Sequence, residues 1–143
     1  MSKKVSAVDL NIHLGNGSEH ALFNWLIASF LMGKRIRSQI AADAYRVIID
    51  KHQRNSPRKL AECMHGELVK MLGEGGYSRY DESTAERLLK LSKKLNDEYG
   101  GKILNIRAAS ADRTDFERRL ADFEGIGPKT VEIFMRDARH VLF

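Results

Sequence analysis

The scarcity of proline constrains the fold of this chain more than any other feature. Proline occurs only at positions 57 and 128 of 143 residues, so long stretches contain no strong helix breaker. Within these stretches apolar residues recur at steps of three and four, which places them on one face of a helix. No run alternates apolar and polar residues over the length of a strand. The sequence therefore predicts an all-α protein of about six or seven helices.

Local signals predict where these helices begin and end. Capping residues mark five starts: Ser18, Ser56 with Pro57, Asp81 or Ser83 (the latter in a capping box with Glu86), Thr114 in a capping box with Glu117, and Pro128. Glycines mark the ends and turns: Gly33, the group Gly73, Gly75 and Gly76, and the pair Gly100-Gly101. We expect residues 1–17 to form an N-terminal arm or short helix, and residues 18–143 to form one helical domain.

Composition narrows the class of protein. The net charge of +5 permits a polyanionic partner without establishing one. Cys63 is the only cysteine, which excludes an internal disulfide and any cluster that needs four cysteines of this chain, and it favours a reducing, cytoplasmic setting. The longest apolar stretch, residues 21–33, is shorter than the roughly 18–20 residues that cross a bilayer. We therefore expect no contact with a membrane.

The segment Leu-Ala-Asp-Phe-Glu-Gly-Ile-Gly-Pro-Lys-Thr, residues 120–130, carries the most specific signal. Gly125 and Gly127 flank Ile126 between two predicted helices; glycine permits a positive φ and close approach of another backbone. Ile126 is expected to pack onto the core. The turn then presents unpaired backbone N–H groups at the positive end of a helix dipole, which suits a phosphate. Lys129 and Thr130 would lie close to such an anion. The alternative is an ordinary helical corner capped by glycine.

This segment resembles the helix-hairpin-helix motif of DNA-binding proteins, here expected over residues 114–137. Segments 22–47, 60–76 and 80–101 resemble successive helices of the HhH-GPD superfamily, the endonuclease III-like DNA glycosylases. The resemblance covers residues 18–136 and implies a compact six-helix barrel. It also implies DNA, duplex and damaged or abasic, as the partner, in base-excision repair.

The resemblance places a catalytic lysine at Lys129, which in bifunctional members attacks the sugar and permits lyase chemistry. The family's catalytic aspartate would fall beyond residue 143, and Asp137, on the same predicted helix as Lys129, is no obvious substitute. The cysteine cluster that holds iron–sulfur in many members has no counterpart. We therefore expect no iron–sulfur cofactor, and base excision that is slow or absent. Two alternatives stay open: a minimal glycosylase or lyase completed by a partner, and a protein-interaction module that retains the fold.

A second basic segment follows the first predicted helix of the domain. Where the family has a glutamine-containing loop, this chain carries Lys34, Arg35 and Arg37, which are candidates for phosphate contacts. A solvated helix start is the alternative. In related proteins the hairpin carbonyls hold a monovalent cation when DNA is bound, and the same is open here; no other metal is expected. Association as a homodimer, or with a partner subunit, is also open.

Aromatic residues divide into two groups. Trp25 and Phe30 fall on an apolar helical face and are predicted to lie in the core. Tyr77 and Tyr80 flank Arg79 and are candidates for exposed residues that stack on a base.

Overall fold

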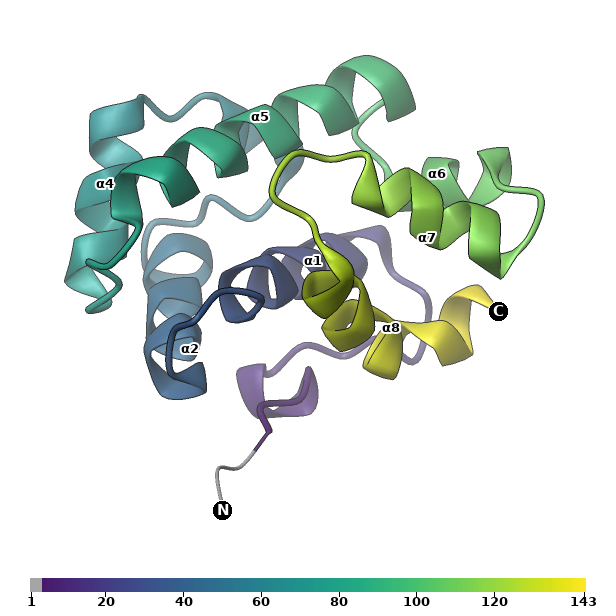
Figure 1. Cartoon of the computed structure of the whole chain (residues 1–143), viewed down its shortest axis with the longest axis horizontal. Helices are drawn as coiled ribbons and strands as arrows, with labels where there is room; N and C mark the ends of the chain where they lie inside the picture. The colour runs from purple at the N-terminus through teal and green to yellow at the C-terminus, as the bar shows by residue number, and fades with distance from the viewer. Residues whose placement is uncertain (1–3) are drawn as a thin grey trace.

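The computed structural model describes residues 4–143. This part of the chain contains eight α-helices and no strand (Figure 1). Their bounds are α1 Glu19–Met32, α2 Ser38–Tyr45, α3 Pro57–Ala61, α4 His65–Glu74, α5 Asp81–Tyr99, α6 Ile103–Ala109, α7 Arg113–Ala121 and α8 Pro128–Leu142. A 3-10 turn at Val8–Leu10 precedes α1, and a π-helical segment, Arg46–Lys51, continues α2. The prediction of an all-α domain is confirmed, with one or two helices more than expected.

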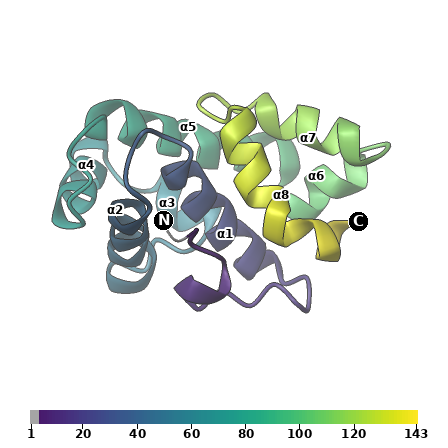
Figure 2. The same ribbon diagram turned by 60° about the horizontal axis from the view of Figure 1, so that its bottom comes forward.

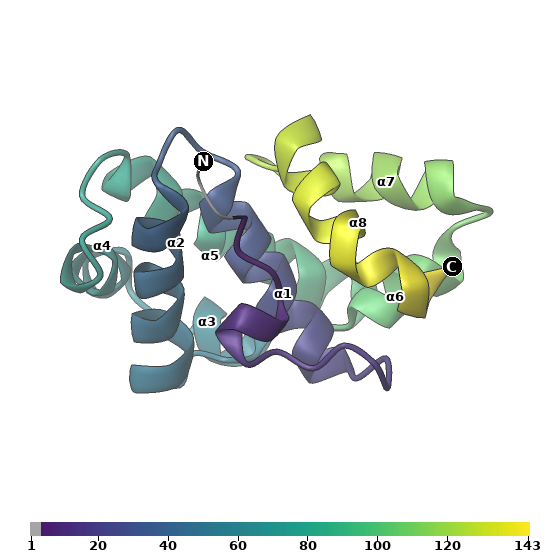
Figure 3. The same ribbon diagram turned by 90° about the horizontal axis from the view of Figure 1, so that it is seen from below.

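Helix α1 forms the centre of the molecule. It lies between α2–α5 on one side and α6–α8 on the other (Figures 2 and 3). Ser18 begins it as predicted, its hydroxyl accepting from the Ala21 N–H at 3.4 Å, and every residue from Ala21 to Met32 is buried. The Trp25 indole N–H donates to the Phe134 carbonyl of α8 at 3.1 Å. This bond ties α8, and the turn before it, to the middle of the core.

Neither predicted capping box forms, although Asp81, one of the two starts predicted for α5, is confirmed. Helix α5 begins at Asp81, and the Ser83 hydroxyl donates to the Tyr80 carbonyl at 3.2 Å from inside the first turn. Asp112 caps α7 and accepts from the Asp115 N–H at 2.9 Å. At α7 Asp112 therefore takes the capping position expected for Thr114, whereas Tyr80, at the N-cap of α5, makes no side-chain capping hydrogen bond.

Helix α6 was not predicted, because it is only seven residues long and buries only Ile103 and Ile106. Its start is capped from far away in the chain. The Glu19 carboxylate accepts from the N–H groups of Ile103 at 2.7 Å and Leu104 at 2.9 Å. No local sequence pattern reports a cap supplied by another helix.

The N-terminal segment, residues 4–17 of the predicted arm, packs against the domain, while residues 1–3 lie outside the described part. Leu10 and Ile12 are buried in the core. The Ala7 N–H donates to the Asp137 carboxylate at 2.8 Å, and Arg136 donates to the Val5 carbonyl at 2.7 Å. Asp137 therefore serves to hold this segment on α8.

The C-terminal end of α8 docks on α6 and α7. Phe143 meets the Phe116 ring edge-on at 5.6 Å between centroids, and the Arg107 guanidinium lies 4.0 Å from the Phe143 ring centroid. Arg107 also donates to the Leu142 carbonyl at 2.8 Å. Among residues 4–143, no helix combines the length and the apolar character required to span a bilayer.

Gly75 provides a test of the packing of α4 on α2. A Cβ at this position would lie 2.5 Å from Ala44 Cα and 2.7 Å from Ala44 N. Because these are backbone atoms, one helix must move, and we expect Gly75→Ala to lower the free energy of unfolding by about 1–3 kcal/mol in urea denaturation. At Gly73 a Cβ would meet nothing within 4 Å. Gly73→Ala is therefore the control, neutral or stabilising by up to about 1 kcal/mol, and equal losses in both variants would contradict this packing.

Candidate nucleic-acid interface

The connection from α7 to α8, residues 122–127, is called here the α7–α8 turn. The Phe123 N–H donates to the Leu120 carbonyl at 3.1 Å, and the Ile126 N–H donates to the Phe123 carbonyl at 3.0 Å. Gly125 has a φ of +90°, and a Cβ there would also lie 2.8 Å from the Arg87 side chain. Glycine is thus required for both its conformation and its lack of a side chain. Ile126 is buried, as predicted.

Backbone N–H groups remain unpaired at the start of α8. Among residues 4–143, the N–H groups of Gly125, Gly127, Lys129 and Thr130 have no hydrogen-bond acceptor. Val131 is the first residue of α8 whose N–H is bonded, to the Gly127 carbonyl at 3.1 Å. A Cβ on Gly127 would meet nothing within 4 Å, so the turn is open at this point. These donors lie at the positive end of the α8 dipole.

The two α8 residues that carry these donors, Lys129 and Thr130, differ in exposure. Lys129 is exposed, whereas Thr130 is 2% exposed and its side chain abuts the end of α1. A Cβ on Gly33 would lie 2.1 Å from Thr130 Oγ1. The Thr130 side chain therefore positions α8 against α1, and the backbone N–H of this residue is the candidate contact.

The structure brings Lys34 to the turn. A cavity of about 380 Å³ is lined by Gly33, Lys34 and residues 125–130, with no acidic side chain among them. Lys34 Nζ donates to the Gly125 carbonyl at 3.3 Å and lies 5.2 Å from the centroid of the Phe30 ring. Burial, and secondarily the charge of Arg87, lower the pKa of Lys34 from its ordinary value. An anion bound here would favour the charged form of Lys34.

A second cavity, of about 310 Å³, adjoins the first. It shares Gly33 and Lys34 with the first and adds Arg35 together with Tyr80, Ser83 and Arg87 of the α5 start, again without an acidic side chain. Arg87 was not identified from the sequence. No local pattern marks Arg87 as part of a site, because the approach of its side chain to Gly125 depends on how α5 packs against the turn.

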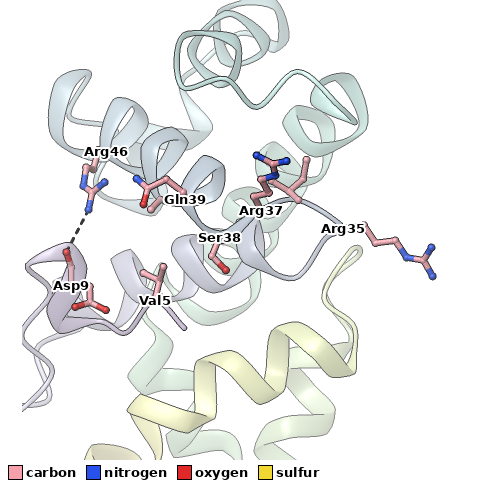
Figure 4. Close-up of a pocket in the computed structure, with 9 residues that line it drawn as sticks. Val5, Asp9, Arg35, Arg37, Ser38, Gln39 and Arg46 are labelled. Atoms are coloured by element: carbon pink, nitrogen blue, oxygen red, sulfur yellow. Dashed lines mark hydrogen bonds between the residues drawn. The ribbon is translucent and has the colours of Figure 1, made fainter. Parts of the chain in front are cut away.

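Arg35 and Arg37 also line a larger cavity of about 940 Å³, between the N-terminal segment and α2 (Figure 4). In Figure 4 Arg46 reaches toward Asp9, with its guanidinium 3.5 Å from the Asp9 carbonyl, whereas Arg35 points away from both. Arg37 lines this larger cavity and neither of the two cavities beside the turn. Of the three basic residues predicted in this loop, Lys34 and Arg35 are the ones placed near the turn.

The two tyrosines differ from each other in exposure. Tyr77 is fully buried and its hydroxyl donates to the Leu31 carbonyl at 3.1 Å, so the prediction that it is exposed is wrong. Tyr80 is 43% exposed, and the Arg79 guanidinium lies 5.1 Å from its ring centroid.

Cations beside the turn lack acidic partners. Lys34, Arg35, Arg87 and Lys129 form no ion pair with any of residues 4–143. Lys90, one turn farther along α5, is by contrast paired with Glu86 at 3.2 Å and Glu124 at 3.1 Å. Neighbouring like charges repel one another, and a polyanion relieves that repulsion.

The described residues contain no group of three or more His, Cys, Asp or Glu side chains arranged to hold a metal ion. Cys63 is buried, and burial raises the pKa of its thiol. The Gly125 carbonyl, a candidate ligand for the monovalent cation considered above, accepts from Lys34.

Comparisons of the chain with models of protein families, with curated proteins and with solved structures found no match. The resemblance to endonuclease III-like glycosylases, with its six-helix barrel and helix-hairpin-helix motif, therefore stays a prediction from the sequence.

Proposed function

We propose that this chain binds the sugar–phosphate backbone of DNA through the α7–α8 turn, in a role related to base-excision repair. The observation that carries the proposal is the set of unpaired N–H groups at Gly125, Gly127, Lys129 and Thr130, beside the ammonium of Lys34. Backbone N–H groups at a helix start form charge-assisted hydrogen bonds with phosphate oxygens. The helix-hairpin-helix resemblance of residues 114–137 predicts the same contact.

The cations around the turn extend this contact along a strand. Lys34 and Lys129 line the cavity at the turn, and Arg35 and Arg87 line the adjoining one. These groups are suited to successive phosphates, which orient a protein on DNA without reporting the base sequence. Binding is therefore expected to be largely independent of sequence.

Lys129 is assigned a phosphate contact in this proposal. It is exposed in the first turn of α8 and has no acidic partner among residues 4–143. The carboxylate of Asp137, on the same helix, is held by the Ala7 N–H. The lyase alternative would require a proton acceptor other than Asp137 near Lys129.

Salt dependence tests the proposal. With four cations at the turn, the logarithm of the association constant for a labelled duplex should fall with the logarithm of salt concentration at a slope of about −4, measured by fluorescence anisotropy. Lys34→Met should weaken binding to all sequences alike and reduce the slope by about 1. Lys93, exposed and paired with Asp97 on α5, provides the matched control. A flat salt response, or equal effects of Lys34→Met and Lys93→Met, would count against the proposal.

The lowered pKa of Lys34 adds a pH dependence. Burial and Arg87 favour the neutral amine in the free protein, while a bound phosphate favours the ammonium. Affinity for DNA should therefore fall as the pH rises through the pKa of Lys34 in the free protein. Anisotropy titrations over the alkaline range should show this decline in the wild-type protein and a weaker one in Lys34→Met. Identical pH profiles for the wild-type protein and Lys34→Met would show that Lys34 does not contact the bound phosphate.

A further inference from the structure

A polar cavity lies apart from the turn, between the N-terminal segment, the start of α1 and the end of the π-helical segment. Its volume is about 310 Å³, and it shares no lining residue with the two cavities beside the turn. Leu10, Ile12 and Ile49 form its apolar wall and are buried. The other lining residues are mostly polar and come from the N-terminal segment, from α1 and from the chain between Tyr45 and Asn55.

Two polar side chains that line this cavity, Asn24 and Tyr45, have atoms without a hydrogen-bond partner among residues 4–143, and that of Asn24 is fully buried. Tyr45 is 2% exposed, and its hydroxyl forms no hydrogen bond with any of residues 4–143. Asn24 is 7% exposed, and its Oδ1 is buried without a hydrogen-bond partner in the same part of the chain. Buried polar groups are normally paired, and leaving them unpaired costs folding free energy. Asn24 Oδ1 is such a group, and the Tyr45 hydroxyl that lines the same cavity is also free to accept a hydrogen bond from a ligand.

The charged residues that line the cavity favour a cationic ligand. Asp50 is the only acidic residue that lines it and forms no ion pair among residues 4–143. Burial, and secondarily the charge of Asp50, raise the pKa of Tyr45 far above its ordinary value. No lysine or arginine lines the cavity. The carboxylate of Asp50 therefore gives the lining its negative charge.

We infer that this cavity binds a small aliphatic amine in its ammonium form. An ammonium group has three N–H donors and no acceptor. It can donate to the Tyr45 hydroxyl oxygen, the Asn24 carboxamide oxygen and the Asp50 carboxylate, while its alkyl chain packs against Leu10 and Ile12. An anion would meet the unpaired Asp50, and an uncharged alcohol would leave that carboxylate without a counter-charge.

A titration of the intact chain with butylamine hydrochloride near pH 8 tests the inference. Two-dimensional ¹H–¹⁵N NMR should show saturable shifts in the Asn24 side-chain amide and in the backbone of residues 10–24 and 45–55. Butanol serves as the uncharged control and potassium chloride as the control for ionic strength. Shifts that do not saturate, or that butanol reproduces to the same extent, would overturn the inference, because neither result requires the ammonium group. Saturation by potassium chloride would overturn the inference in favour of a bare cation.

Variants assign the contacts. Asp50 is exposed, so Asp50→Asn should fold normally and weaken butylamine binding at least tenfold. Tyr45→Phe should weaken binding severalfold and leave the melting temperature of the ligand-free protein unchanged or raised, because it removes a hydroxyl that has no partner. Glu62→Gln, at an exposed acid outside the cavity, serves as the control. Unchanged affinity in Asp50→Asn would contradict the inference even if Tyr45→Phe failed to fold.

Discussion

Replacing Trp25 with alanine is expected to lower the free energy of unfolding by about 3–5 kcal/mol. Trp25 is fully buried in the central helix α1, and its indole N–H donates to the Phe134 carbonyl of α8 at 3.1 Å. The substitution removes a large apolar side chain and leaves a cavity between the two helices that position the turn. Because Trp25 is the only tryptophan, unfolding should be followed by circular dichroism rather than by fluorescence.

Trp25→Phe separates packing from hydrogen bonding. Phenylalanine retains most of the apolar volume but cannot donate to the Phe134 carbonyl, so a loss of about 1–2 kcal/mol is expected. If Trp25→Ala cost no more than Trp25→Phe, α1 would not be the centre of the core.

Replacing Gly127 with aspartate is expected to weaken DNA binding while slightly stabilising the protein. Gly127 is the N-cap of α8 with an extended φ of −102°, a conformation in which an aspartate side chain accepts from the free N–H groups of the first turn. We expect a gain in unfolding free energy of a few tenths of a kcal/mol. The same carboxylate occupies and repels the phosphate site, so affinity should fall by about 1.5–3 kcal/mol, roughly ten- to hundredfold.

Two further substitutions at Gly127 isolate the cause. Asparagine accepts from the same N–H groups without a charge, so Gly127→Asn should weaken binding less than Gly127→Asp. Alanine leaves the N–H groups free, and its Cβ would meet nothing within 4 Å, so Gly127→Ala should bind DNA within a few-fold of the wild-type protein. If Gly127→Asp bound DNA as well as Gly127→Ala did, the turn would not be the site of contact.

Local sequence patterns predicted the helix boundaries that are set by neighbouring residues. Ser18 and Gly33 bound α1 as expected, Pro128 begins α8, and Ile126 is buried in the turn. Helix α6 escaped prediction because its cap, Glu19, is supplied by α1. Asp81, one of the two starts predicted for α5, is confirmed, whereas the start of α7 was misplaced because Asp112 and not Thr114 caps this helix.

The candidate site was predictable in its parts and not in its assembly. The glycine spacing at residues 125–127 indicated free donors before a helix, and the basic loop indicated Lys34 and Arg35. The hydrogen bond from Lys34 to Gly125 and the packing of Arg87 on Gly125 depend on the contacts of α1 and α5 with the turn. Tyr77 was misassigned for the same reason, since its partner, the Leu31 carbonyl, belongs to α1.

The most direct test of backbone recognition at the turn is a ¹H–¹⁵N NMR titration of the wild-type protein with a short DNA duplex at low salt. The account predicts that the backbone amides of Gly125, Gly127, Lys129 and Thr130 show the largest saturable shifts, and that added salt reverses them. If these amides stayed unchanged while the protein bound DNA through another face, or if no resonance shifted at all, the account would be contradicted.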